Sequence, residues 1–103
     1  MKLVQTCAAC PEQYELRTQE GTVIGRLKFR YGRFRAWHKG RIVHLSILGG
    51  VDGVFSQEER AEQLPLGVAE ILRAEGSVAE RDIPGLAKTL SAAFIRVDPG
   101  DDF

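Results

Sequence analysis

Hydrophobic and polar residues alternate through the first half of the chain, which is the pattern of β-strands with one buried face. Tyr14 and Leu16 share a side of the first such segment, and Gln13 falls on the other side. We expect four antiparallel strands that follow one another as a β-meander over about residues 12–48. The alternation divides into segments at about residues 12–18, 22–31, 34–38 and 41–48.

Three short turns would connect these strands and fix their register, because a shift of one residue moves every side chain to the opposite face. The predicted turns are Glu20-Gly21, Gly32-Arg33 and Lys39-Gly40. The first turn pairs Tyr14 with Leu27. The second pairs Tyr31 with Phe34 and Phe29 with Ala36, and the third pairs Phe34 with Leu45 and Ala36 with Val43. One face of the sheet is then continuously apolar, and the opposite face collects Glu15, Arg17, Arg26, Lys28, Arg30, Arg35, Trp37, Ile42 and His44.

The second half of the chain has the period of helices. Ser56 followed by Glu59 is a capping box, which predicts the start of a helix. Pro65 would end or kink this helix, so we expect one helix over about 57–64 and a second over about 65–75, closed by Gly76. A last helix is expected over about 83–96. The predicted fold is therefore α+β, with the four-stranded meander followed by two or three helices over about residues 57–96.

The chain has 103 residues, 44% of them hydrophobic and 27% charged, which fits a single packed domain over residues 1–103. Residues 1–11 and 98–103 are expected to be flexible ends. No apolar run reaches the roughly 18 residues that span a bilayer. The start of the chain also lacks the long apolar stretch of a signal peptide. We therefore expect a cytoplasmic protein with no membrane partner.

The charges are segregated along the chain, although 14 basic and 14 acidic residues cancel overall. Between Arg26 and Arg41 there are seven basic residues and no acidic one. The predicted register puts Arg30 opposite Arg35 and Arg26 opposite Lys39. Like charges that face each other across a strand pair are destabilising. Folding alone does not explain such a row, so we expect it to bind a partner through Arg26, Lys28, Arg30, Arg33, Arg35, Trp37, Lys39 and Arg41.

The first interpretation of this basic face is a non-enzymatic module that contacts nucleic acid. Trp37 among cations is typical of single-strand binders, which combine stacking platforms with a basic groove. The second interpretation is a protein-interaction factor, of the kind that phages encode, that docks on an acidic protein surface. Acidic helices folded over the face, or a homo-oligomer that neutralises it, are the alternatives to a binding role.

Cys7 and Cys10 lie three positions apart and, with His38 and His44, are candidates for a structural zinc site. The predicted meander places His38 on the apolar face and His44 on the other face, so both cannot reach one ion. Ordinary cysteines near the chain start are the favoured interpretation, and we expect no cofactor. No nucleophile, phosphate-binding loop or catalytic triad has a recognisable spacing, which favours a protein that is not an enzyme.

Several segments share a pattern with known proteins. They are Cys10-Pro11-Glu12-Gln13-Tyr14-Glu15, the glycine-bounded basic hairpin from Gly25 to Phe34, Asp52-Gly53-Val54-Phe55 and Glu58-Glu59-Arg60. In these segments the chain resembles a family of small bacterial and phage proteins with no assigned activity. The resemblance covers about half of the chain and implies a shared sheet.

Overall fold

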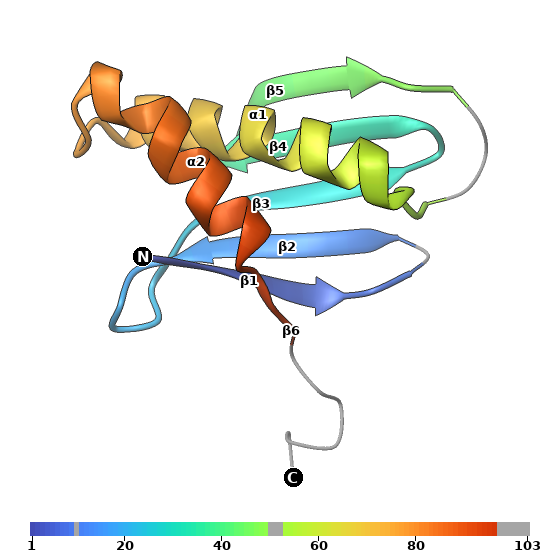
Figure 1. The fold of residues 1–103 in the computed structure, drawn as a ribbon, viewed down its shortest axis with the longest axis horizontal. Helices are drawn as coiled ribbons and strands as arrows, with labels where there is room; N and C mark the ends of the chain where they lie inside the picture. The colour runs from blue at the N-terminus through green and yellow to red at the C-terminus, as the bar shows by residue number, and fades with distance from the viewer. Residues whose placement is uncertain (10, 50–52, 97–103) are drawn as a thin grey trace, which may run out of the picture.

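A computed structural model describes residues 1–9, 11–49 and 53–96 of the chain. The fold is α+β, with a mostly antiparallel sheet and two α-helices (Figure 1). The strands are β1 (Lys2–Cys7), β2 (Glu12–Arg17), β3 (Val23–Arg30), β4 (Arg33–His38), β5 (Arg41–Ile47) and β6 (Ile95–Arg96). The helices are α1 (Gln57–Glu75) and α2 (Ile83–Ala92), with a 3-10 turn at Glu80–Asp82 between them.

The sheet has the strand order β5-β4-β3-β2-β1-β6, and only the pairing of β1 with β6 is parallel. The four predicted strands of the meander are confirmed as β2 to β5. Residues 2–7, which the pattern assigned to a flexible start, form β1. They do so because Leu3 pairs with Leu16 of β2 and is buried in the core. The expected flexible end at 98–103 lies outside the described residues.

The turn between β3 and β4 is one residue earlier than predicted. Tyr31 and Gly32 both have positive φ, 53° and 71°, as a two-residue type I′ turn requires. Phe29 therefore faces Phe34, and the predicted pairings of Tyr31 with Phe34 and of Phe29 with Ala36 are wrong. The pairing of Tyr14 with Leu27 is confirmed.

The turn at Lys39-Gly40 is confirmed, with φ values of 51° and 77°, but the register of β5 shifts beyond it. Trp37 faces Ile42 while Ala36 faces His44, so Val43 is an extra residue on β5. The predicted pairing of Ala36 with Val43 is therefore wrong. Phe34 likewise faces Ser46 rather than Leu45. This bulge exchanges the faces of all residues from His44 onward.

Helix α1 is continuous through Pro65, so the predicted break there is wrong. A proline inside a helix costs about 3 kcal/mol. Leu64 and Val68, on either side of Pro65, are fully buried, and packing of this kind offsets the cost. The capping box of Ser56 and Glu59 and the left-handed cap at Gly76 are confirmed.

Helix α2 ends at Ala92, four residues before the predicted end. The chain then turns so that the ring of Phe94 packs edge-on against Tyr14, with ring centroids 5.3 Å apart. Ile95 pairs with Val4 in the parallel β6. These tertiary contacts replace the last helical turn.

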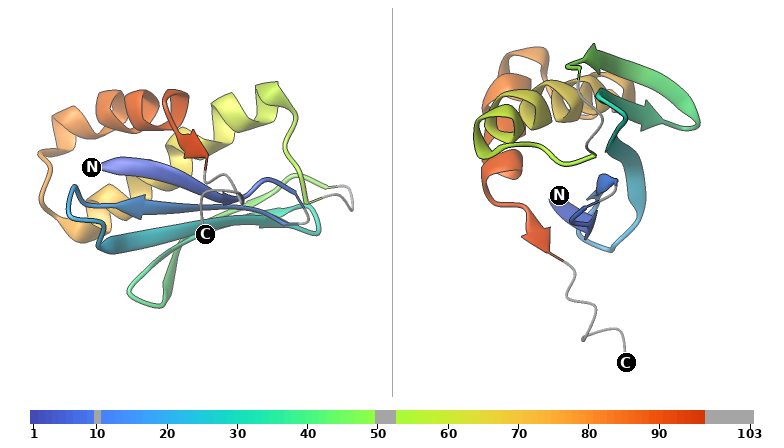
Figure 2. Two further views of the ribbon diagram at one scale, coloured as in Figure 1. Left: turned by 90° about the horizontal axis from the view of Figure 1, so that it is seen from below. Right: turned by 90° about the vertical axis from the view of Figure 1, so that its right-hand side faces the viewer.

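Both helices pack against the same side of the sheet, which we call the helix side (Figure 2). The core lies between the helices and this side. The opposite side, which we call the open face, is covered by none of the helices or strands in the described ranges. Among these elements, no helix is both long enough and apolar enough to cross a membrane. The largest fully buried side chains of the core include Leu3, Tyr14, Leu16, Leu27, Phe34, Leu64, Ile71 and Leu72.

Candidate binding surface on the open face of the sheet

Six of the eight predicted binding residues share the open face. The register of β3 with β4 places Lys28 beside Arg35, Arg30 beside Arg33 and Arg26 beside Trp37. The predicted pairings of Arg30 with Arg35 and of Arg26 with Lys39 are wrong, because the turn lies one residue earlier. The row nevertheless stays on one face, and two like-charged pairs still face each other. Its members are Arg26, Lys28, Arg30, Arg33, Arg35 and Trp37.

The remaining two predicted residues lie elsewhere. Lys39 is in the turn between β4 and β5. Arg41 is the cross-strand partner of His38, so its side chain lies on the helix side. His44, predicted on the basic face, is also on the helix side because of the bulge at Val43.

One carboxylate neutralises part of the open face. Glu15 accepts a hydrogen bond from Arg17 at 2.6 Å and lies 3.5 Å from Arg26. Among the described residues, Lys28, Arg33 and Arg35 form no ion pair with a carboxylate. Positive charge is therefore concentrated toward the end of the face near the β3–β4 turn.

An aliphatic row lies directly beside the basic row. The register places Ile42 next to Trp37, Leu45 next to Arg35 and Ile47 next to Arg33. These aliphatic side chains are 54%, 51% and 73% exposed. The sequence pattern predicted Ile42 on this face but placed Leu45 in the core, so the row was not recognised. The signal was present in Ile42-Val43, two adjacent apolar residues that break the alternation at the bulge.

A hollow of about 820 Å³ lies where β2, β3 and β4 meet near the β4–β5 turn. The hollow is lined on the open face by Gln13, Glu15, Arg26, Lys28 and Trp37. Two cations, one carboxylate and one aromatic ring therefore border this recess.

The two histidines both lie on the helix side. The Nε2 of His38 lies 3.1 Å from a carboxylate oxygen of Glu75, and the Nε2 of His44 lies 2.9 Å from the hydroxyl of Ser46. Burial lowers the pKa of His44, and the negative charge of the nearby Glu70 offsets part of this decrease. The prediction that the two histidines point to opposite faces is therefore wrong.

The described residues do not assemble the predicted zinc ligands into one site. The Sγ of Cys7 donates to the carbonyl of Ala9 at 3.2 Å, and Cys10 lies outside the described residues. Within the described ranges, no group of three or more His, Cys, Asp and Glu side chains is placed to hold a metal ion.

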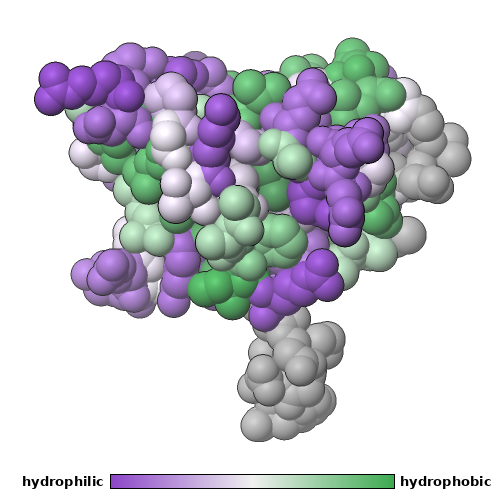
Figure 3. All heavy atoms as spheres, viewed as in Figure 1, coloured by the Kyte–Doolittle hydropathy of each residue, from purple (hydrophilic) through white to green (hydrophobic). Residues whose placement is uncertain are grey.

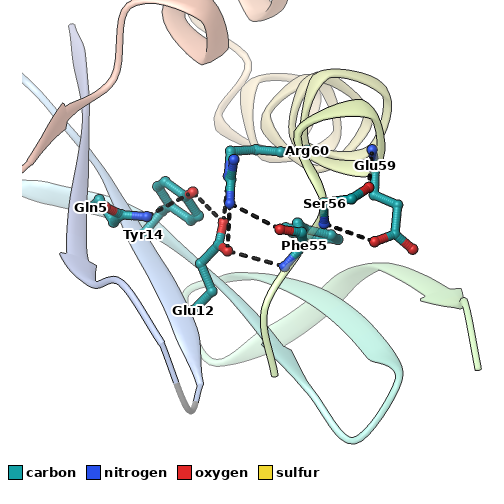
Figure 4. Close-up of polar contacts among 7 residues, drawn as sticks. All are labelled: Gln5, Glu12, Tyr14, Phe55, Ser56, Glu59 and Arg60. Atoms are coloured by element: carbon teal, nitrogen blue, oxygen red, sulfur yellow. Dashed lines mark hydrogen bonds and ion pairs between the residues drawn. The ribbon is translucent and has the colours of Figure 1, made fainter. Parts of the chain in front are cut away.

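A buried carboxylate on the helix side is the polar group that the sequence analysis missed. Glu12 is fully buried and receives two hydrogen bonds from Arg60, at 2.8 and 2.9 Å (Figure 4). The amide of Phe55 donates to Glu12 at 3.1 Å, and the hydroxyl of Tyr14 donates to its other oxygen. Gln5 donates to Tyr14 at 3.0 Å. The sequence did contain a signal for this buried carboxylate, because Glu12 alternates with Tyr14 and Leu16 and so falls on the buried face of its strand.

This Glu12 cluster is structural. A carboxylate offers about four acceptor sites, and all four are taken by groups of the protein itself. Burial and the hydrogen bond to Glu12 raise the pKa of the Tyr14 phenol. The cluster joins β2 to the segment before α1 and to α1.

Comparison with known proteins finds no matching family model, no matching curated protein and no matching solved structure. Function is therefore argued from the site alone.

Proposed function

We propose that the protein is a non-enzymatic binding module that docks on an acidic protein partner through the open face. The observation that supports this is the basic row, Lys28, Arg30, Arg33 and Arg35, lying directly beside the exposed aliphatic row. Contiguous exposed apolar groups rimmed by charge are typical of protein–protein interfaces. The aliphatic row supplies apolar area, and the basic row selects an acidic surface.

Nucleic acid is the second candidate partner. The cationic row with Trp37 among its members favours it, because arginines that track a phosphate backbone and an aromatic platform are the usual parts of single-strand binding. The three aliphatic side chains next to the row offer no stacking surface. They are the reason that a protein partner ranks first.

Affinity capture from a nuclease-treated bacterial lysate tests the proposal. The wild-type chain should retain an acidic protein, and the Arg30→Glu/Arg35→Glu variant should lose it. The Arg81→Glu/Arg96→Glu variant is the matched control, because it makes the same charge change at exposed positions away from the open face. Equal retention by both variants would exclude the open face as the docking surface.

A titration with short oligonucleotides at two salt concentrations tests the second candidate. Phosphate contacts release counterions, so nucleic-acid binding should weaken steeply as salt rises. Binding of this kind, lost in Arg30→Glu/Arg35→Glu, together with no protein retained after nuclease treatment, would replace the first candidate by the second.

A further inference from the structure

Strand β5 is an edge strand and forms one margin of the sheet. Within the described part of the chain it has a neighbouring strand, β4, on one side only, and it lies at the border of the sheet in Figure 1. Alternate residues of such an edge strand direct their N–H and C=O groups outward, where another strand can pair with them. Natural edges are commonly shortened or covered, whereas β5 spans seven residues.

The two sides of this margin differ in chemistry. On the open face it carries the aliphatic row of Ile42, Leu45 and Ile47. Hydrophobic residues also gather at this margin when the molecule is viewed from the helix side (Figure 3). On the helix side, β5 carries Arg41 and His44. His44 borders a groove that is also lined by residues of α1 and α2, among them Lys88 of α2.

Two cations on the helix side of the margin stand outside the ion pairs of the described residues. The groove also contains Glu70 and Arg73, and Arg73 forms ion pairs with both Glu70 and Glu80. Arg41 and Lys88 remain without a carboxylate partner among the described residues. A strand added to β5 would therefore meet aliphatic groups on one side and the cations Arg41 and Lys88 on the other.

We infer that β5 receives an extended segment of the partner protein as an additional strand, and that this segment alternates apolar and acidic residues. The inference rests on the proposed function and specifies how the partner is bound. Main-chain hydrogen bonds to β5 would supply affinity, and the alternating side chains would supply specificity. Apolar side chains would pack on the aliphatic row, and acidic ones would face Arg41 and Lys88.

A second copy of the chain fits this margin less well. Pairing of two β5 strands would bring Arg33, Arg35 and Arg41 of each copy toward the same seam. Like charges brought together in this way disfavour association. The acidic residues of the proposed segment would instead complement Arg41.

The test uses a synthetic peptide of alternating valine and glutamate that matches the length of β5. Trp37 is the chain's single tryptophan and neighbours Ile42, so its fluorescence reports binding on the open face. Amide hydrogen exchange reports strand addition. The peptide should slow exchange in β5. The same peptide N-methylated at alternate residues should bind about tenfold more weakly, because it keeps the side chains but loses the main-chain donors.

A pair of variants locates the site. Leu45→Lys should weaken peptide binding about tenfold, and Ile95→Lys should leave it unchanged. Leu45 and Ile95 are 51% and 52% exposed, and they lie on opposite margins of the sheet, so the substitutions are matched. Equal effects of the two substitutions would contradict the inference.

Three other outcomes would overturn the inference. A change in Trp37 fluorescence without slower exchange in β5 would exclude strand addition and leave docking on the open face intact. Slow β5 exchange without peptide, together with a dimer in sedimentation, would identify a second copy as the occupant. Peptide that does not bind, with a protein still captured from the nuclease-treated lysate, would show that the partner uses another structure.

Discussion

At the scale of single residues, Glu12 shows how one buried charge can connect distant parts of a small domain. Its carboxylate is fully buried and is satisfied by Arg60, Tyr14 and the amide of Phe55. A buried ion pair of this kind is weak evidence for stability by itself, but removal of one partner leaves the other uncompensated.

Glu12→Gln should therefore destabilise the fold by about 3 to 5 kcal/mol, since the Arg60 guanidinium loses its counter-charge inside the protein. Urea unfolding measures the change. Glu15→Gln is the control, because Glu15 lies on the open face, where its ion pairs with Arg17 and Arg26 are partly exposed and worth about 1 kcal/mol or less. Equal losses in the two variants would contradict the structural role of the Glu12 cluster.

The same cluster predicts a pH dependence at alkaline pH. Burial raises the pKa of Tyr14 above its ordinary value of 10.0, so the folded chain retains a phenol proton that the unfolded chain releases. The stability that Tyr14 contributes should be complete below about pH 10 and should decline as pH rises above that value.

Unfolding of the wild type and Tyr14→Phe, compared between pH 8 and about pH 11, isolates this contribution. Their difference in stability should shrink as pH rises. A difference that stays constant over this range would show that the Tyr14 pKa is not raised by folding.

At the scale of secondary-structure elements, the approach of α1 to the sheet depends on Gly67. A Cβ at this position would lie 2.8 Å from Leu27 and 2.9 Å from the Phe34 ring. Real Cβ atoms are essentially never so close to other atoms, so a larger residue would force the helix away from the core.

Gly67→Ala should destabilise the fold by about 1 to 2 kcal/mol, because overpacking outweighs the gain in helix propensity. Gly85→Ala in α2 is the matched control. A Cβ there meets nothing within 4 Å, so it should stabilise by up to about 1 kcal/mol. Thermal unfolding of the two variants should shift in opposite directions, and a shift in the same direction would contradict the packing of α1.

Sequence periodicity predicted the four central strands and both ends of α1, because alternation and capping residues are local signals. Periodicity failed where tertiary contacts determine the local structure. The position of Glu12 on the buried face of its strand is explained only by its partner Arg60, which is distant in the sequence. Helix α1 continues through Pro65 because the residues around Pro65 pack in the core. The basic row was predicted, but the aliphatic row was not, since the bulge at Val43 exchanges faces without a glycine to mark it.

At the scale of the whole molecule, the segregated charges of the sequence become segregated surfaces. Lys28 faces Arg35 and Arg30 faces Arg33 on a face that no described helix or strand covers. These pairs oppose folding by about 0.2 to 1 kcal/mol each. Their presence is explained if the face binds an acidic partner.

Arg30→Glu/Arg35→Glu should therefore fold at least as stably as the wild type, because each like-charged pair becomes an opposite-charged pair worth about 0.2 to 1 kcal/mol. Urea unfolding at low salt measures this. The gain should decrease in high salt as the surface charges are screened. A variant that is less stable than the wild type would show that these arginines serve the fold.

Protection of arginine side chains tests the docking surface most directly. An arginine-selective dicarbonyl reagent, read by mass spectrometry, compares the free chain with the chain bound to its captured partner. Docking on the open face predicts that Arg30, Arg33 and Arg35 are protected in the complex, while Arg81 and Arg96 react as in the free chain. Protection of Arg81 or Arg96 with unchanged reactivity of the basic row would contradict it.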